Sequence, residues 1–110
     1  RDISSKRISS GALISARQML AIGRALMSAP ELILFDEISL GLAPTIIKDI
    51  YARIRQINAE GTSVVLVEQD VKRSIKTSEY AHIMLKGRVV LSGPSSELGE
   101  EAVKNAYFGI

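Results

Sequence analysis

Two short apolar runs, each followed at once by polar side chains, constrain the fold of this chain most strongly. Leu32–Phe35 leads into the paired carboxylates Asp36 and Glu37, and Val64–Val67 also ends in polar residues. Such runs are typical of strands buried on both faces inside a parallel sheet. Ligands of open α/β sheets bind just beyond the carboxyl ends of the strands. The acid pair is therefore either an ion site, with a Mg²⁺-bound nucleotide as the expected ligand, or an ordinary polar strand end.

The segments around the first strand have the pattern of helices. A helical pattern runs from about Ala12 to Ala29 and is stopped by Pro30. Pro44 is well placed to begin the next helix, and Gly61 lies where its C-terminal cap is expected. Between them, isoleucines recur at helical spacing and predict a core-facing stripe: Ile47, Ile50, Ile54 and Ile57.

The remainder of the chain predicts a short helix and then a hairpin. The helix is expected over about 71–78, and Lys86-Gly87 is a turn signal between strands at 80–85 and 88–92. Short helical pieces follow, near 95–98 and 100–107. This order predicts an α/β fold with a mostly parallel sheet, flanking helices and a terminal β-hairpin.

The composition excludes several classes of protein. The chain has 110 residues, of which 46% are hydrophobic, so it is one small domain or part of a larger one. It contains no cysteine, and its basic residues are scattered, which argues against a disulfide framework and against nucleic acid as a partner. The longest apolar runs have four residues, far fewer than the roughly 20 that a membrane helix needs. We expect a cytoplasmic protein.

Several sequence stretches, in matching order and spacing, resemble the ATP-binding subunits of ABC transporters, which are P-loop NTPases. The nearest subgroup is the branched-chain amino-acid uptake ATPases. The resemblance runs from about Ala12 to Ile110, and these stretches carry it: Gln18–Leu26, Asp36-Glu37, Ser39–Pro44, Val67–Asp70 and Val103–Gly109. It implies ATP and Mg²⁺ as cofactors, a second ATPase subunit and transmembrane permease subunits as partners, and a place on the inner face of the plasma membrane reached only through the permease.

The resemblance also implies roles for single residues. Asp36 matches the Walker B aspartate, which holds Mg²⁺ through its water shell, and Glu37 matches the acid that polarises the attacking water. Gln69 stands where most of these ATPases have a switch histidine, and the branched-chain subgroup often has glutamine there. As a neutral amide, Gln69 can donate to a phosphate oxygen or orient the water. The D-loop, which crosses to the partner subunit's nucleotide, would contain Ser39, Leu40 and Gly41.

One departure from the family pattern is an absence. No stretch of these 110 residues has the form G-x-x-x-x-G-K-[ST], whose backbone N–H groups cradle phosphates. We therefore expect the chain to be the C-terminal half of an ABC ATPase domain. Its expected parts are a polar lead-in at 1–11, a signature-type helix at 12–30, and the Walker B, D-loop, switch and C-terminal elements at 31–110.

The second departure is in the signature motif, normally Leu-Ser-Gly-Gly-Glu/Gln. Aligned without gaps, this degenerate nucleotide-contacting motif includes Leu13, Ile14 and Ser15, with Leu13 in place of the usual serine. Ile14 replaces the first glycine, and its β-branch obstructs close approach to a phosphate. An alternative alignment uses Ser10-Gly11-Ala12 and needs about three inserted residues. Ile38 also stands where the family usually has proline after the catalytic acid.

Three hypotheses about the function of the chain follow. The first is an ATP-binding and ATP-hydrolysing subunit of an ABC importer for branched-chain amino acids, present here as a portion that is inactive in isolation. The second is a non-catalytic remnant or interaction module derived from such a subunit. The third is a response-regulator-like domain that uses Asp36 and Glu37, which the flanking sequence fits less well.

Overall fold

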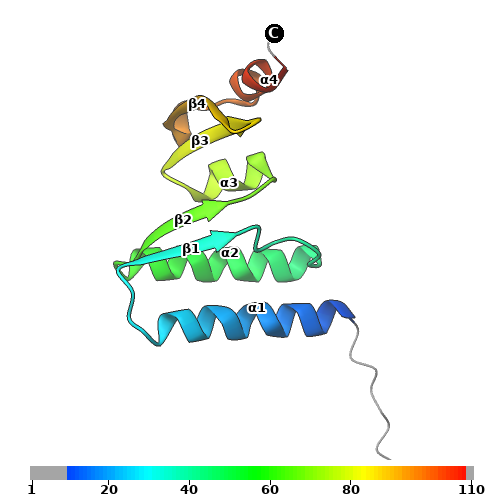
Figure 1. Ribbon diagram of the computed structural model, residues 1–110, viewed down its shortest axis with the longest axis vertical. Coiled ribbons are helices and arrows are strands. Elements are labelled where there is room, and N and C mark those ends of the chain that lie inside the picture. The colour runs from blue at the N-terminus through cyan, green and yellow to red at the C-terminus, as the bar shows by residue number, and fades with distance from the viewer. Residues whose placement is uncertain (1–9, 109–110) are drawn as a thin grey trace, which may run out of the picture. The chain divides into compact units, whose positions relative to one another are not determined.

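The computed structural model describes the backbone of residues 10–108 and the side chains of residues 16–108. The chain divides into two units, residues 1–67 and residues 68–110, and each contains one two-stranded sheet (Figure 1). A polar lead-in is expected at 1–11, and residues 1–9 of it lie outside the described residues. Its last two residues, Ser10 and Gly11, belong to the first helix instead.

The first unit consists of two helices and two parallel strands in alternation. Its elements are α1 (Ser10–Leu26), β1 (Leu32–Asp36), α2 (Pro44–Ala59) and β2 (Ser63–Val67). The two strands pair in parallel, with Leu32 beside Ser63 and Asp36 beside Val67. Because parallel strands need a crossover, α2 connects them and packs against the sheet (Figure 1).

Helix α2 begins and ends as the sequence predicts. Pro44 occupies its first turn, where a missing N–H costs no hydrogen bond. Gly61 follows the C-cap with φ of +107°, a conformation that glycine adopts without strain. The predicted stripe faces the core at Ile50, Ile54 and Ile57, while Ile47 is only partly buried.

The core of the first unit is almost entirely aliphatic. Side chains from β1, α1, α2 and the loop after β1 form one buried cluster: Ile22, Ile33, Phe35, Ile38, Ile50, Ile54 and Ile57. Partly buried residues of β2, Val64 and Leu66, pack against it. Among the described side chains of α1, Ile22 belongs to the buried cluster and Ala25 packs against it.

The prediction that both strands are buried on both faces is wrong. Residues of β1 alternate between exposed and buried, with Leu32 and Leu34 52% and 69% exposed. Residues of β2 alternate between exposed and partly buried, with Val65 and Val67 48% and 53% exposed. The helices of the unit cover one face of the sheet. The residues on the other face are also mostly apolar, which is why the sequence predicts burial on both faces.

Helix α1 ends earlier than its sequence pattern indicates. It stops at Leu26, and the residues up to Ala29 form turns in which the Ala29 N–H donates to the Leu26 carbonyl at 3.0 Å. The Ser28 hydroxyl donates to the carbonyl of Ala25 at 2.8 Å. Ala29 has φ of +47°, so the chain reverses before Pro30 rather than continuing the helix up to it.

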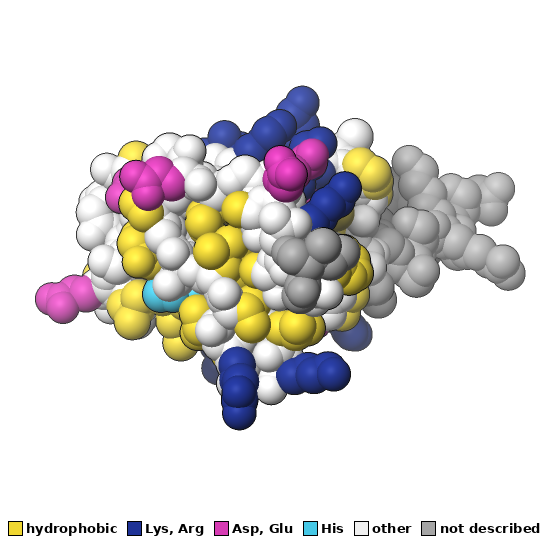
Figure 2. All heavy atoms as spheres, turned by 90° about the horizontal axis from the view of Figure 1, so that it is seen from above, with side chains coloured by type: hydrophobic (Ala, Val, Ile, Leu, Met, Phe, Trp, Pro, Cys, Tyr) yellow, Lys and Arg dark blue, Asp and Glu magenta, His cyan; other side chains and the backbone are white. Residues whose placement is uncertain are grey.

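The second unit combines a hairpin with short helices. Its elements are α3 (Val71–Thr77), β3 (Tyr80–Leu85), β4 (Arg88–Pro94), the 3₁₀ turn η1 (Ser95–Glu97) and α4 (Glu100–Phe108). The hairpin turn is the one predicted, because Lys86 and Gly87 both have positive φ, as a type I′ turn requires. His82 is an exposed strand residue with its ring 5.1 Å from that of Tyr80. Hydrophobic side chains are exposed on the face of the molecule seen in Figure 2.

None of the helices in the described part of the chain combines the length and apolar character needed to cross a bilayer.

The burial of Ile50 gives the first prediction. Its side chain has no exposed surface, so Ile50→Ala is expected to lower the free energy of unfolding by about 2–5 kcal/mol. The neighbouring Asp49→Ala, on the exposed face of α2, should change it by less than about 0.5 kcal/mol. Urea denaturation followed by circular dichroism measures both; equal losses would mean that α2 does not present this stripe to the core.

Candidate functional site

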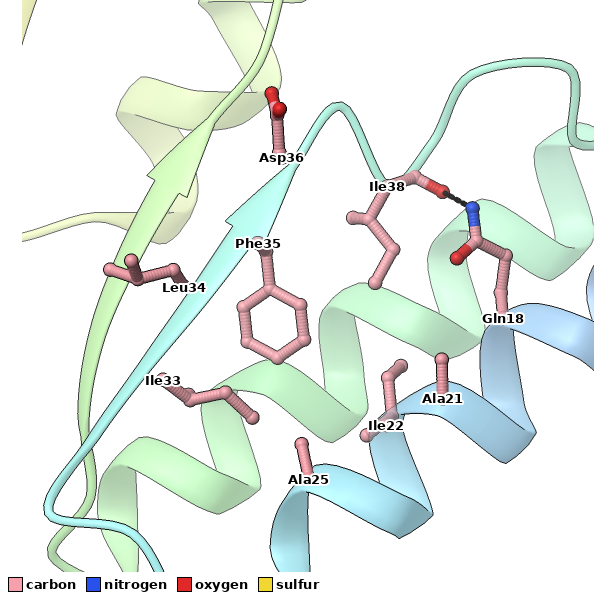
Figure 3. Close-up of a pocket in the computed structure, with 9 residues that line it drawn as sticks. All are labelled: Gln18, Ala21, Ile22, Ala25, Ile33, Leu34, Phe35, Asp36 and Ile38. Carbon is pink, nitrogen blue, oxygen red and sulfur yellow. Dashed lines mark hydrogen bonds between the residues drawn. The ribbon is translucent and has the colours of Figure 1, made fainter.

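The carboxyl ends of β1 and β2 bring the predicted acid pair to one edge of the sheet. Asp36 is the last residue of β1, lies beside Val67 at the end of β2, and is exposed. Side chains alternate along a strand, so Asp36 shares its side of the sheet with Leu34. Figure 3 shows Leu34 on the side of β1 away from the helices and Phe35 directed toward them. The Asp36 carboxylate therefore lies at the surface, where a ligand can reach it.

Glu37 follows in a conformation that ordinary residues avoid. Its φ is +49°, in the left-handed region, where the β-carbon crowds the backbone. Two hydrogen bonds hold the backbone there: the Glu37 N–H donates to the Val67 carbonyl at 2.7 Å, and the Leu40 N–H donates to the Glu37 carbonyl at 3.1 Å. Residues held in such regions concentrate at functional sites, and the Glu37 side chain is partly buried here.

Ile38 anchors the loop that Glu37 begins. Its side chain is buried in the core cluster, and its carbonyl accepts a 3.4 Å hydrogen bond from the Gln18 amide of α1 (Figure 3). The sequence marks Ile38 only as a departure from proline and Gln18 only as one letter of a motif. Neither periodicity nor composition indicates that these two residues meet, because they are 20 positions apart and on different elements.

A hollow of about 150 Å³ lies between α1 and β1 beside this loop. Gln18 and Asp36 are the only polar residues among those that line it, and small side chains, Ala21 and Ala25, form its α1 wall (Figure 3). Phosphate groups are bound by several N–H donors or cations, and among these lining side chains only Gln18 carries an N–H donor, which already donates to the Ile38 carbonyl. The hollow is therefore a gap in packing at the edge of β1 rather than a nucleotide site.

The predicted D-loop residues form an exposed turn before α2. The Leu42 N–H donates to the Ser39 carbonyl at 3.2 Å, and Gly41 has φ of +76°. Leu40 projects into solvent. An exposed apolar side chain on a tight loop is suited to contact with another chain.

The other predicted site residues lie elsewhere. Gln69 belongs to the second unit, between the end of β2 and Asp70, whose carboxylate accepts the Arg73 N–H and caps α3. Three signature residues lie in the first half of α1, and their side chains are outside the described residues: Leu13, Ile14 and Ser15.

Metal binding by this edge of the sheet needs ligands beyond the described side chains. In that part of the chain, no group of three or more His, Asp or Glu residues could hold a metal ion together. A lone exposed carboxylate such as Asp36 still fits Mg²⁺, which is usually held by one or two carboxylates together with substrate phosphates. The donor set thus suits a nucleotide-bound ion and not a structural metal.

Comparisons with known proteins agree with this geometry, although no protein-family model matches the chain. The chain is 47% identical over 94 residues to the high-affinity branched-chain amino acid transport ATP-binding protein BraG of Pseudomonas aeruginosa, a match that covers 84% of this chain and 40% of that protein. It is 32% identical over 94 residues to the lipopolysaccharide export system ATP-binding protein LptB of Escherichia coli, covering 84% and 39%.

Solved structures give the same result for the fold. An ATP-binding cassette of an ABC transporter in its ADP conformation superposes with a TM-score of 0.68 at 28% identity, over 83% of this chain and 34% of that one. A nucleotide-free cassette gives a TM-score of 0.69 at 27% identity, over 84% and 35%. The predicted α/β fold is confirmed, and the chain spans about two fifths of the curated relatives' length or less.

The backbone of Glu37 yields the second prediction. Glycine adopts positive φ without strain, so Glu37→Gly is expected to be more stable than Glu37→Ala by about 1 kcal/mol. Both variants remove the carboxylate, so their difference isolates the backbone conformation. Urea titration of the two proteins in parallel measures it, and an alanine variant as stable as the glycine variant would show that residue 37 is not left-handed in solution.

Proposed function

We propose that this chain is part of an ATP-binding subunit in an importer of branched-chain amino acids. The premise is its relationship to the ATP-binding subunits of ABC transporters. The observation that carries the proposal is the Asp36-Glu37 pair at the carboxyl end of a parallel strand, in a chain 47% identical to BraG. That identity exceeds the 32% shared with the lipopolysaccharide exporter subunit, which favours the amino-acid importer.

Asp36 would bind the metal of a bound nucleotide. Its carboxylate is exposed at the end of β1 and can hold Mg²⁺ through water while phosphate oxygens fill the remaining positions. Bound in this way, Mg²⁺ would offset the charge of the γ-phosphate. These 110 residues contain no phosphate-binding loop, so Asp36 and Glu37 would account for one side of the site.

Glu37 would act as the acid that polarises the attacking water. A carboxylate in this role must keep one direction, and the hydrogen bonds to Val67 and Leu40 fix the backbone from which it projects. Gln69 would donate its amide N–H to a phosphate oxygen or orient the same water. Because an amide does not titrate, Gln69 would perform this role without the pH dependence of a histidine.

The remaining proposed contacts are with other subunits. The exposed loop of Ser39, Leu40 and Gly41 would meet a second ATPase subunit, and the degenerate signature at Leu13, Ile14 and Ser15 would face that subunit's nucleotide. Transmembrane permease subunits would hold the assembly at the inner face of the plasma membrane. We assign residues 12–30 to the signature helix and 31–110 to the Walker B, D-loop, switch and C-terminal elements of one partial domain.

A second candidate function is a non-catalytic interaction module. The observation that favours it is the signature, in which Leu13 and Ile14 replace the usual serine and glycine. A bulky β-branched residue in place of glycine keeps a phosphate away from the backbone N–H groups.

A chimera tests the two functions. Residues 10–110 of this chain replace the corresponding stretch of BraG, and ATP hydrolysis is measured with the purified protein. We expect slow hydrolysis that rises when Leu13→Ser and Ile14→Gly restore the signature, and that falls by about 10²–10⁴-fold with Glu37→Gln. If the restored chimera binds ATP without hydrolysing it, the interaction module is the correct function.

The isolated chain provides a further prediction. Purified as these 110 residues, it should show no ATP turnover above background at millimolar Mg²⁺, because Asp36 has no phosphate-binding loop opposite it. A coupled phosphate-release assay measures this, with Asp36→Asn as the matched control. Turnover that disappears in the control would show that the chain builds a complete site by itself.

A further inference from the structure

A second hollow of the first unit, which we call the interhelix groove, lies between α1 and α2. Its volume is about 280 Å³, and four apolar side chains form its walls: Met19, Ile22, Leu26 and Ile57. Ile22 and Ile57 belong to the buried core, whereas Met19 and Leu26 are each 38% exposed. Packed protein interiors leave few voids larger than a water molecule, so a groove of this size is space that a ligand can occupy.

The α2 rim of the groove carries one cation, one amide and one anion. Arg53, Gln56 and Glu60 all line the groove, and their spacing places them on one face of α2. Arg53 Nη1 donates to Gln56 Oε1 at 3.4 Å, and Gln56 Nε2 donates to Glu60 Oε1 at 3.3 Å. The ion pairs found among the described residues include neither Arg53 nor Glu60. Both charges therefore have capacity for a charged ligand.

We propose that the interhelix groove binds a free α-amino acid with an aliphatic side chain. The carboxylate of the ligand would accept from the Arg53 guanidinium, and its ammonium would donate to the Glu60 carboxylate. Its side chain would lie on the apolar walls of the groove. The inference is independent of the proposed function, because neither Asp36 nor Glu37 lines this groove.

The Gln56 amide displays the hydrogen-bonding pattern that such a ligand needs. Its oxygen accepts from Arg53 and its N–H donates to Glu60, as the carboxylate and the ammonium of an amino acid would do. Both hydrogen bonds are longer than the usual N–H···O distance of about 2.9–3.0 Å. Hydrogen bonds in which both partners are charged are shorter and stronger. A zwitterion would therefore displace the exposed, neutral amide from its place between the two charges.

Size and charge exclude other small ligands. The groove is smaller than the roughly 300–1,000 Å³ of pockets for drug-sized molecules, which favours a ligand of few heavy atoms. Glu60 would repel a simple carboxylic acid, and Arg53 would repel a simple amine. An amino acid without an aliphatic side chain would leave the walls in contact with water, which should lower its affinity by at least about tenfold.

The experiment uses the methionines of the full 110-residue chain, which number three. Their methyl groups are labelled with ¹³C and observed by NMR during titration with L-leucine, in the absence of ATP. We expect the Met19 signal to shift and saturate, while Met84, on β3 of the second unit, provides an unmoved internal reference. Glycine should need at least about tenfold higher concentrations. A ligand that lacks one charge, 4-methylpentanoate or 3-methylbutylamine, should bind about three- to fivefold more weakly than L-leucine.

Two variants test the rim directly. Arg53→Met and Glu60→Gln should each weaken L-leucine binding by about three- to fivefold, the loss expected for one exposed ion pair. Arg55→Met on α2 and Glu101→Gln on α4 are the matched controls, because both residues are exposed and neither lines the groove. All four variants should keep the circular dichroism spectrum of the chain. An unmoved Met19 signal, equal affinity for L-leucine and 4-methylpentanoate, or rim variants that bind as well as their controls would each overturn the proposal.

Discussion

The packing of one face of the parallel β1–β2 pair on the isoleucine stripe of α2 supports the rest of the first unit. Ile33 and Phe35 of β1 meet Ile50, Ile54 and Ile57 in one buried cluster. The same contact sets the register of the sheet, because a slip by one residue would turn the buried side chains outward. This packing therefore also sets the positions of Asp36, Glu37 and Ile38 at the carboxyl end of β1.

The candidate site shows that dependence directly. The Glu37 N–H reaches the Val67 carbonyl only because β1 and β2 end side by side, and that hydrogen bond helps hold Glu37 in a left-handed conformation. Ile38 then turns back into the core, so the loop is fixed on both sides of the acid. A residue that the sequence marks as a departure from the family pattern thus contributes to the packing under the site.

Elements that rest on strong local signals could be predicted from the sequence. Pro44 and Gly61 mark the ends of α2, Lys86-Gly87 marks the hairpin turn, and their positions agree with the structure because each residue type has a particular backbone preference. The end of α1 could not be predicted, since its pattern continues to Ala29 while the chain must already reverse toward β1. The contact between Gln18 and Ile38 is also a product of packing between elements distant in sequence.

By itself, the sequence determined the order of the elements, the aliphatic core, the acid pair at a strand end and the resemblance to ABC ATP-binding subunits. These features are local, and residue types and their spacing encode them. Only the tertiary structure decided which faces of the strands are covered, that Asp36 lies on the exposed side of the sheet with Leu34, and that Glu37 is held by β2. An apolar strand has the same composition whether one face is buried or two, and only the elements packed on it make the difference.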